Sequence, residues 1–278
     1  MSNLAPTFRM EKTILASARE LQLCTGRTPA YDPKTTLNTL YNVFPSLLPI
    51  APQYPTIQYF GIGINGFTNI NDSNLSQPNE VSSTDMNLYT QIPFRCVPVE
   101  QDLTPTERAQ YRLRVLRTIN GNDYYCYYLK MITYNDSAVQ ITQTDPTTNL
   151  QKAYVVDYSN LTPTVPTSQL NGVISSSTTE VNTTVSANLP VTGAEVVEAI
   201  SVLYNNLQYA RVSEVGIYSG VDAMVTGTDA NNNPITYTEA AFVQMASHYC
   251  YLGTDLSSTT STYDFATLIG NGDVILLG

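Results

Sequence analysis

Apolar residues recur with helical spacing near the start of the chain. Within residues 7–25 they form a stripe made of Met10, Ile14, Ala18 and Leu21. Thr7 is a suitable N-cap and Gly26 can end the element, so this pattern predicts a helix.

A second helical pattern follows. Asp32 and Pro33 place a capping acid before a proline at the first helical position. The next apolar positions at helical spacing are Leu37, Leu40, Tyr41 and Phe44. Prolines then crowd residues 45–55, and a helix cannot continue through them. We therefore expect a helical N-terminal arm followed by a proline-rich, extended connector.

From Thr56 onward the pattern changes to short strand-like runs separated by turn residues. Residues 57–60 predict a strand that leads into a group of glycines, and residues 68–80 predict a polar loop. Residues 91–99 predict an edge strand, because their two prolines cannot take part in a full hydrogen-bond ladder.

The strongest local signal is a β-hairpin between Tyr111 and Ile132. Two β-rich runs, YRLRVLRTI and YYCYYLKMI, flank an Asn-Gly turn. Residues 104–107, TPTE, precede the hairpin and predict a capped helical turn. Further strands are expected near 138–143 and 152–158.

Residues 159–191 are rich in Ser, Thr, Asn and Pro, and they predict either a long loop or an extended arm. A capping box at Thr192 and Glu195 then predicts the start of a helix. The runs RVSEVGIYSGVDAMVTGT and AAFVQMASHYCYLGT predict two or three more strands. The last residues, VILLG, are apolar, so the C-terminus is expected to be buried or paired with a strand.

Together these patterns predict an α+β fold that is predominantly β. We expect a helical N-terminal arm, a β-rich, sandwich-like or barrel-like body, and one capped helix before the C-terminal strands. The expected divisions are the arm and connector (1–55), the body (56–158), the loop or extended arm (159–191), and the helix with the strands that complete the body (192–278).

Composition adds that the chain carries little charge. Only 13% of its 278 residues are charged, against roughly 25% in typical proteins, while Tyr occurs 20 times and Trp is absent. Neutral polar groups cost less to dehydrate than charges do, and Tyr is favoured at interfaces. The composition favours a protein that functions inside an assembly, although extracellular β-proteins have a similar composition.

The net charge, the apolar runs and the cysteine content further limit the classes of protein to which the chain could belong. A net charge of −10 argues against a general nucleic-acid binder. The first twenty residues lack a signal-peptide core, and no run approaches 18 apolar residues, so we expect neither export by a signal peptide nor a membrane span. The four cysteines form no C-x-x-C motif and are expected to be buried free thiols, with one disulfide pair as the alternative.

The stretch YFGIGINGF, residues 59–67, matches the spacing G-x-G-x-x-G. A dinucleotide site needs a helix after the last glycine, yet the residues after Gly66 are turn formers without an apolar stripe. We interpret these glycines as places of close backbone approach or a bulge in a strand. No cofactor is expected.

Two other patterns could carry chemistry. His248 is the only histidine, and no nucleophile elbow accompanies it. It shares a strand face with Cys250, and we interpret it as a structural residue. Asp229, Asn231 and Asn233 match the first ligand positions of a calcium loop, but its glycine and glutamate are missing. A polar hairpin turn is expected there, with a weak cation site as the alternative. No catalytic residue or metal ligand is assigned.

Arginine and tyrosine are interleaved in the predicted hairpin. The candidate interface residues are Arg112, Arg114 and Arg117 on its first strand and Tyr124, Tyr125, Tyr127 and Tyr128 on its second. Such side chains can bind phosphates and stack on bases, or form a protein interface, where both types are frequent hot spots. In an acidic chain we favour an interface with an acidic patch on another copy.

The segments ARVSEVGIYSGVD (210–222) and TEAAFVQMASHYCYLGTDLS (238–257) resemble virion structural proteins of tailed bacteriophages. The combination of YFGIGINGF, IPFRCVPV and RLRVLRTINGNDYYCYYLKMI shares this resemblance. The resemblance implies a symmetric, multi-copy position in the neck, tail or baseplate. It carries no functional residues across, because such proteins act through their interfaces.

We therefore expect a non-enzymatic virion protein, a ring protomer of the neck or collar at the head-to-tail connection, or of the tail. Its expected partners are copies of itself and other neck or tail proteins, after assembly in the host cytoplasm. DNA would at most pass through a lumen without sequence-specific binding. The alternative is a baseplate, fibre-attachment or host-receptor module that binds glycans in a Tyr-lined groove. A third hypothesis, an enzyme, requires a cleft in which carboxylates or His248 converge with shifted pKa values.

Overall fold

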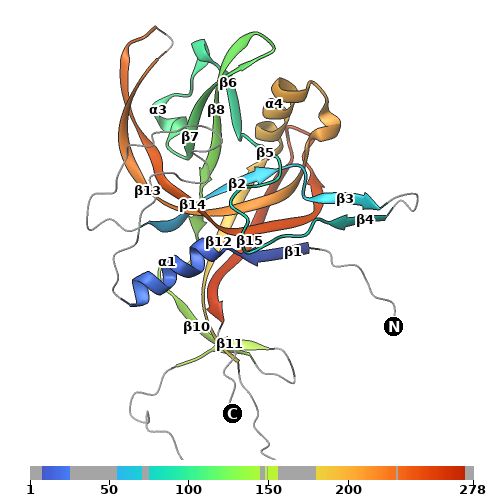
Figure 1. Ribbon diagram of the computed structural model, residues 1–278, viewed down its shortest axis with the longest axis vertical. Helices are drawn as coiled ribbons and strands as arrows, with labels where there is room; N and C mark the ends of the chain where they lie inside the picture. The colour runs from blue at the N-terminus through green and yellow to red at the C-terminus, as the bar shows by residue number, and fades with distance from the viewer. Residues whose placement is uncertain are drawn as a thin grey trace, which may run out of the picture. The chain divides into compact units, whose positions relative to one another are not determined.

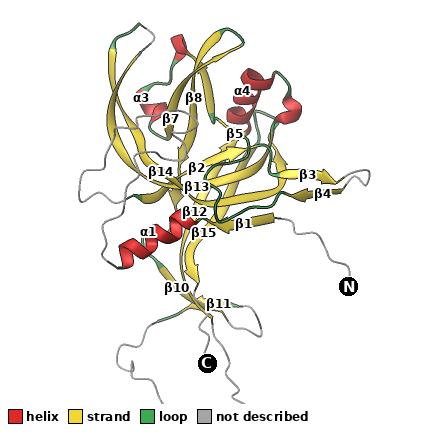
Figure 2. Cartoon of the chain, in the orientation of Figure 1, coloured by secondary structure: helices red, strands yellow, loops and turns green. Residues whose placement is uncertain are grey.

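The structure is a computed structural model that describes residues 8–25, 55–70, 75–144, 148, 150–155, 180–229 and 231–272 (Figure 1). The fold is α+β and predominantly β with open sheets, which confirms the predicted class (Figure 2). The chain divides into two compact units. The first contains Met1–Ile132 and Pro190–Asp264, and the second contains Thr133–Leu189 and Phe265–Gly278.

The first unit is built on an eight-stranded sheet with the order β1-β14-β13-β2-β8-β6, in which β5 also pairs with β2 and β7 with β8. Neighbouring strands of this sheet pair antiparallel. The strands are β1 (Phe8–Lys12), β2 (Thr56–Gly63), β5 (Gln91–Ile92), β6 (Arg95–Pro98), β7 (Tyr111–Ile119), β8 (Asn122–Met131), β13 (Arg211–Thr228) and β14 (Pro234–Asp255).

The expected N-terminal helix is only partly correct. Residues 8–12 form β1, which pairs with β14, and α1 (Ile14–Cys24) begins after it. Thr13 is the observed N-cap, because its Oγ1 accepts a hydrogen bond from the N–H of Ala16 (3.2 Å). Pairing with a distant strand thus overrides the helical spacing of the first residues. The expected cap at Thr7, the second helix and the proline connector up to residue 54 lie outside the described residues.

The glycine-rich stretch confirms the interpretation of close backbone approach. β2 leads directly into β3 (Phe67–Ile70), so the helix that a dinucleotide site needs is not there. A Cβ atom on Gly66 would lie 1.9 Å from the carbonyl oxygen of Ser213. The N–H of Gly66 donates to the Oγ of Ser213 (2.8 Å), which fixes the contact.

The polar loop expected over residues 68–80 is wrong in part. β3 pairs with β4 (Leu75–Pro78) as a two-stranded ribbon, and residues 71–74 lie outside the described part of the chain. Side-chain hydrogen bonds support the ribbon: Ser76 Oγ donates to Asn69 Oδ1 (2.7 Å), and Thr68 bonds Asn79. Polar residues therefore pair here instead of forming a loop. The expected edge strand 91–99 is present as β5 and β6, interrupted at Pro93, and β6 ends the sheet.

The predicted hairpin and both predicted capping boxes are confirmed. β7 and β8 meet at Asn120 and Gly121, whose φ angles are 52° and 82°. The helices α3 (Pro105–Arg108) and α4 (Gly193–Tyr204) each begin with a full capping box. Among described residues no helix is long and apolar enough to cross a membrane.

A buried carboxylate supports a strained position in β7. Leu113 has a φ of 59°, which interrupts the regular alternation of the strand. The carboxylate of Glu239, on β14, accepts the N–H groups of Leu113, Arg114 (2.8 Å) and Ala240 (2.7 Å). Burial raises the pKa of Glu239, and these backbone bonds act against that rise. Glu239 thus accepts backbone donors at and next to this left-handed position.

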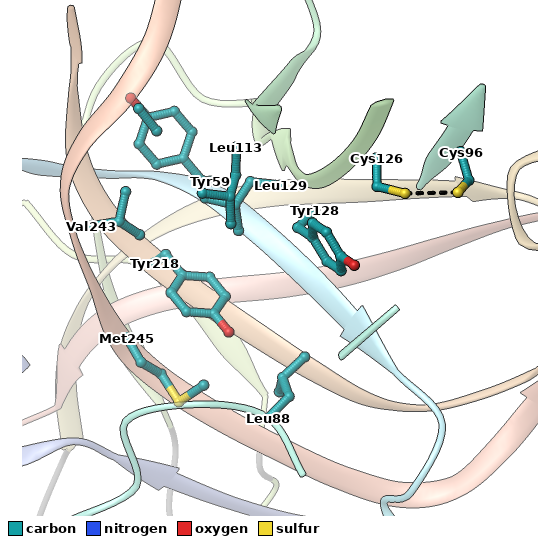
Figure 3. Packing of buried hydrophobic residues seen from close by; sticks show 11 residues of the cluster. Tyr59, Leu88, Cys96, Leu113, Cys126, Tyr128, Leu129, Tyr218, Val243 and Met245 are labelled. Atoms are coloured by element: carbon teal, nitrogen blue, oxygen red, sulfur yellow. Dashed lines mark hydrogen bonds between the residues drawn. The ribbon is translucent and has the colours of Figure 1, made fainter. Parts of the chain in front are cut away.

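The apolar core of the first unit lies between β2, β7–β8 and β13–β14. Figure 3 shows its central cluster, which consists of Tyr59, Leu88, Cys96, Leu113, Cys126, Tyr128, Leu129, Tyr218, Ala240, Val243 and Met245. Tyrosine supplies much of this core, and its hydroxyl can bond to buried carboxylates, as Tyr59 does to Asp222 (2.6 Å).

The second unit contains a separate sheet with the order β11-β10-β12-β15, in which β9 also pairs with β12. Its strands are β9 (Thr133–Tyr134), β10 (Gln140–Thr144), β11 (Gln151–Ala153), β12 (Glu180–Thr192) and β15 (Thr262–Gly272). Residues 180–191 of the expected loop or arm are therefore strand. The expected body, 56–158, is not a single unit, because the structure assigns its residues up to Ile132 to the first unit and those from Thr133 to the second. The expected C-terminal pairing concerns residues 273–278, which lie outside the described residues.

The contact at Gly66 gives a test of this fold. Replacing Gly66 with Ala forces a Cβ atom against backbone, so we expect a loss of about 3 kcal/mol or more in unfolding free energy, measured by urea denaturation. Gly227→Ala is the matched control, because its Cβ would meet only the ring of Tyr237, at 3.0 Å. Equal stability losses in the two variants would contradict the packing described.

Candidate functional site

Arg114, Tyr125 and Tyr127 of the β7–β8 hairpin gather around the carboxylate of Asp102, together with Arg108 of α3. Asp102 Oδ2 accepts hydrogen bonds from Arg108 (3.0 Å) and Arg114 (2.8 Å). Its Oδ1 accepts the hydroxyl of Tyr127 (2.5 Å), and the guanidinium of Arg114 lies 3.4 Å from the ring centroid of Tyr125. Burial alone would lower the pKa of Arg114, but its bonds to Asp102 outweigh burial and raise it. Both guanidinium groups therefore bond the same carboxylate within the chain.

The same hairpin makes a second ion pair, between Arg112 and Asp222. Arg112 Nε and Nη2 donate to the two carboxylate oxygens of Asp222 (2.9 and 2.8 Å), which also accepts the hydroxyl of Tyr59. Sequence spacing predicted Arg112 and Arg114 on one face of a strand. The left-handed backbone at Leu113 lies between them, and each arginine bonds a different carboxylate.

Most of the seven predicted interface residues contribute to the interior. Arg112, Tyr125, Tyr127 and Tyr128 are buried, Arg114 and Tyr124 are half-buried, and Arg117 alone of the seven is exposed. Their role at a subunit interface stays a prediction. Their observed role is to hold β7, β8 and the residues before α3 together.

The only histidine of the chain is surrounded by ionisable groups. His248 Nδ1 lies 2.9 Å from Asp85 Oδ2, and its Nε2 lies 3.6 Å from Glu214 Oε2. The Sγ of Cys250 is 3.5 Å from the same Nε2, which confirms that the two residues share a strand face. The ring of Tyr89 covers the imidazole at a centroid distance of 5.2 Å. Asp85 and Glu214 were not predicted, since they share no sequence spacing with His248.

Glu214 connects this cluster to the glycine-rich stretch. Its side chain is fully buried, and its Oε1 accepts the N–H groups of Asn65 (2.7 Å) and Thr90 (3.2 Å). Its Oε2 accepts the N–H of Tyr89 (2.6 Å). One carboxylate thus fastens the turn after β2 and the segment before β5 to strand β13.

The cluster around His248 has the residue types of a nucleophilic site but the burial of a structural one. A cysteine, a histidine and an aspartate in contact are the groups that activate a thiol as a nucleophile. However, the side chains of His248 and Cys250 have no exposed surface, so a substrate cannot reach them without opening of the sheet. Burial alone would lower the pKa of His248, but hydrogen bonds with Cys250, Glu214 and Asp85 raise it to about 10. The imidazole therefore stays protonated at neutral pH and cannot act as a general base.

The predicted calcium-like sequence forms a hairpin turn. Asp229 Oδ1 accepts the N–H groups of Asn231 and Asn233 (both 2.8 Å), and its Oδ2 accepts the Nδ2 of Asn233 (3.0 Å). The turn joins β13 to β14, as expected. Across the described ranges no group of three or more His, Cys, Asp and Glu side chains is arranged to hold a metal ion.

An exposed apolar set lies on β1 and α1. It consists of Phe8, Met10, Ile14 and Leu21, with exposed fractions of 61%, 46%, 54% and 66%. Helix α1 contacts the sheet instead through a buried arginine, Arg19, whose guanidinium bonds Ser219 and Gln244. The stripe predicted from helical spacing is thus on the outer side of α1. The signal that could have revealed this is Arg19, which lies on the opposite face of the helix.

A second exposed set lies at the end of α4. Tyr204 and Tyr209 have ring centroids 5.1 Å apart, and Leu207 lies between them in sequence within η2 (Leu207–Tyr209). Leu207 also lines a hollow of about 620 Å³ together with Gln208, Arg211, Gly253, Asp255 and Ser257. Two exposed tyrosines in ring contact therefore lie near a hollow whose lining contains both signs of charge.

Comparison with known proteins identifies the family of the chain. Residues 1–278 match the family of unknown function DUF7208, and the chain belongs to that family. No curated protein and no solved structure matches the chain.

The protonated state of His248 predicts how stability depends on pH. The pKa is about 10 in the folded protein and about 6.5 when unfolded, so the stabilisation is complete below pH 6.5 and is lost as pH rises toward 10. We expect wild type to lose on the order of 4 kcal/mol of unfolding free energy over this range beyond what His248→Gln loses. Urea titrations at several pH values measure this difference. Parallel curves for the two proteins would show that His248 is not held as an imidazolium.

Proposed function

We propose that this member of the DUF7208 family is a structural protein of a tailed-bacteriophage virion. It would form a multi-copy ring of the neck or collar, at the head-to-tail connection, or of the tail, and act through subunit interfaces. The observation that carries this proposal is the exposed apolar set of β1 and α1.

The exposed apolar set is presented on a firmly attached element. Thr13 Oγ1 donates to the carbonyl of Met245 (2.6 Å), and the N–H of Ile14 donates to the carbonyl of Ser83 (2.7 Å). Together with the buried Arg19, these bonds hold α1 against the sheet. Burial of apolar surface on a neighbour contributes about 25 cal/mol per Å², and little ordering cost opposes it when the element is already fixed.

The position of β1 at the end of the sheet also supports a subunit contact at the exposed apolar set. β1 ends the strand order of the first sheet, and within the described residues it pairs with β14 alone. An edge strand offers backbone N–H and C=O groups to another chain, while its exposed side chains Phe8 and Met10 add apolar contact. A second copy would thus find both backbone and side-chain partners at one edge.

The chemistry of the interior favours a mechanical role over catalysis. The carboxylates of Asp102, Asp222 and Glu195 bond arginine or lysine side chains inside the first unit. His248, the only histidine of the chain, is buried and its pKa is raised, which does not support a histidine-based catalytic site. These groups hold the fold together and leave neutral and apolar side chains for contacts with neighbours.

The assignment to a virion rests on the resemblance of strands β2, β6–β8, β13 and β14 to structural proteins of tailed phages. These strands make up most of the sheet of the first unit. In a closed ring each subunit contacts its neighbours through two different surfaces. The edge at β1 would supply one of them.

Light scattering of the purified chain over a range of concentrations tests the proposal. We expect a discrete oligomer for wild type and a shift toward monomer for the double variant Ile14→Ser, Leu21→Ser, because it removes apolar contact without changing charge. Val139→Ser is the control, since Val139 is 61% exposed and belongs to the other unit. An unchanged mass in the double variant would contradict the role of β1 and α1.

The tyrosines at the end of α4 favour a second candidate, a host-receptor module that binds glycans. Exposed aromatic rings stack on sugar faces, and the Arg211 and Asp255 side chains beside Leu207 could bond hydroxyl or carboxylate groups. Arg211 is also held over the ring of Phe67, at 4.7 Å from the centroid, which orients it.

A glycan-array screen tests this candidate. If it is correct, wild type binds a defined set of glycans and Tyr209→Ala loses at least tenfold in affinity, whereas Tyr134→Ala keeps full affinity. Tyr134 is similarly exposed but lies in the second unit. Absence of binding across the array, or equal loss in both variants, would reject the glycan site.

A further inference from the structure

Two cysteines of the core face each other across neighbouring strands. Cys96 on β6 is directly opposite Cys126 on β8 in the antiparallel register. Both side chains are buried, and both are free thiols. Their Sγ atoms are 2.7 Å apart. Figure 3 shows the two side chains pointing toward each other.

We propose that Cys96 and Cys126 form a reversible disulfide when the folded protein meets a small oxidised disulfide such as oxidised glutathione. This inference is independent of the proposed function. One cysteine loses its proton and its thiolate attacks the glutathione disulfide, which releases one glutathione thiolate. The second cysteine thiolate then attacks the mixed disulfide, forms the Cys96–Cys126 bond and releases the second glutathione. The two electrons lost by the cysteines reduce one oxidised glutathione to two molecules of glutathione.

The backbone already has the arrangement that such a bond needs. Cβ atoms of directly opposed residues in an antiparallel pair lie roughly 4.5–5.5 Å apart, close to the spacing across a disulfide. The neighbouring pairs Arg95–Tyr127 and Val97–Tyr125 fix the register on both sides. Formation of the bond therefore requires side-chain rotation and small strand adjustments, not a new strand pairing.

A helix holds β6 in this position. The carboxylate of Glu198, on α4, accepts the N–H of Cys96 (2.8 Å) and the Nε of Arg95 (3.0 Å). The sulfur atoms thus stay opposed for as long as α4 and β6 are folded. A disulfide would cross-link β6 covalently to β8, while α4 would stay attached to β6 through the hydrogen bonds of Glu198.

The local environment sets the rate of the reaction. The hydrogen bond with Cys126 and burial both raise the pKa of Cys96, so little thiolate is present at neutral pH. β6 ends the strand order of the sheet, and strands at an edge open more readily than central ones. We therefore expect slow oxidation at neutral pH that becomes faster as pH rises.

Cys250 provides a matched comparison within the same unit. It is also buried and free, but its sulfur lies against His248 Nε2 instead of another cysteine. If proximity of two thiols decides the outcome, oxidation will join Cys96 to Cys126 and leave Cys250 reduced.

The experiment is to incubate the folded full-length chain with millimolar oxidised glutathione, denature it, alkylate the remaining thiols and map the peptides by mass spectrometry. We expect a linked peptide containing Cys96 and Cys126, with both absent from the alkylated set, and reversal by dithiothreitol. Melting temperature should rise by roughly 5–10 °C on oxidation, because the bond closes a loop in the unfolded chain.

Cysteine-to-serine variants identify which thiols form the bond. Cys250→Ser should still form the linked peptide, whereas Cys96→Ser and Cys126→Ser should not. Peptide mapping of wild type decides the question by itself if a serine variant fails to fold. Alkylation of both Cys96 and Cys126 after prolonged oxidation, or a glutathione adduct that never resolves to the internal bond, would overturn the proposal.

Discussion

The first unit depends on a carboxylate that is cut off from water. Glu214 lies near the start of β13, and its buried oxygens are stabilised by the N–H groups of Asn65, Tyr89 and Thr90 and by the protonated ring of His248. A buried charge is tolerated only when such donors surround it. The segments before β5 and after β2 must therefore close over the sheet. The absence of a side chain at Gly66 lets the second of these segments approach.

The local features of the fold could be predicted from sequence because their signals are local. The turn at Asn120 and Gly121 and the capping box at Thr192 and Glu195 depend only on neighbouring residues. β1 could not be predicted, because residues 8–12 become a strand only by pairing with β14. The same holds for the cluster around His248: alternation places Cys250 beside it, but Asp85 and Glu214 reach it from distant segments.

The low charge of the chain has a structural explanation. Many of its few ionisable side chains satisfy one another inside the first unit, as Lys130 and Glu195 do at 2.7 Å, where Glu195 also caps α4. The same chain exposes apolar side chains on β1 and α1 and tyrosines at the end of α4. Exposed apolar side chains gathered on one strand and one helix are consistent with a surface that neighbours cover.

Negative-stain electron microscopy of the purified full-length chain tests the central claim, that this protein acts as a subunit of a closed assembly, most directly. The account predicts ring-shaped particles with a fixed number of subunits once the concentration is high enough for the edge at β1 to be occupied. Single protomers at every concentration, or filaments that never close, would contradict it.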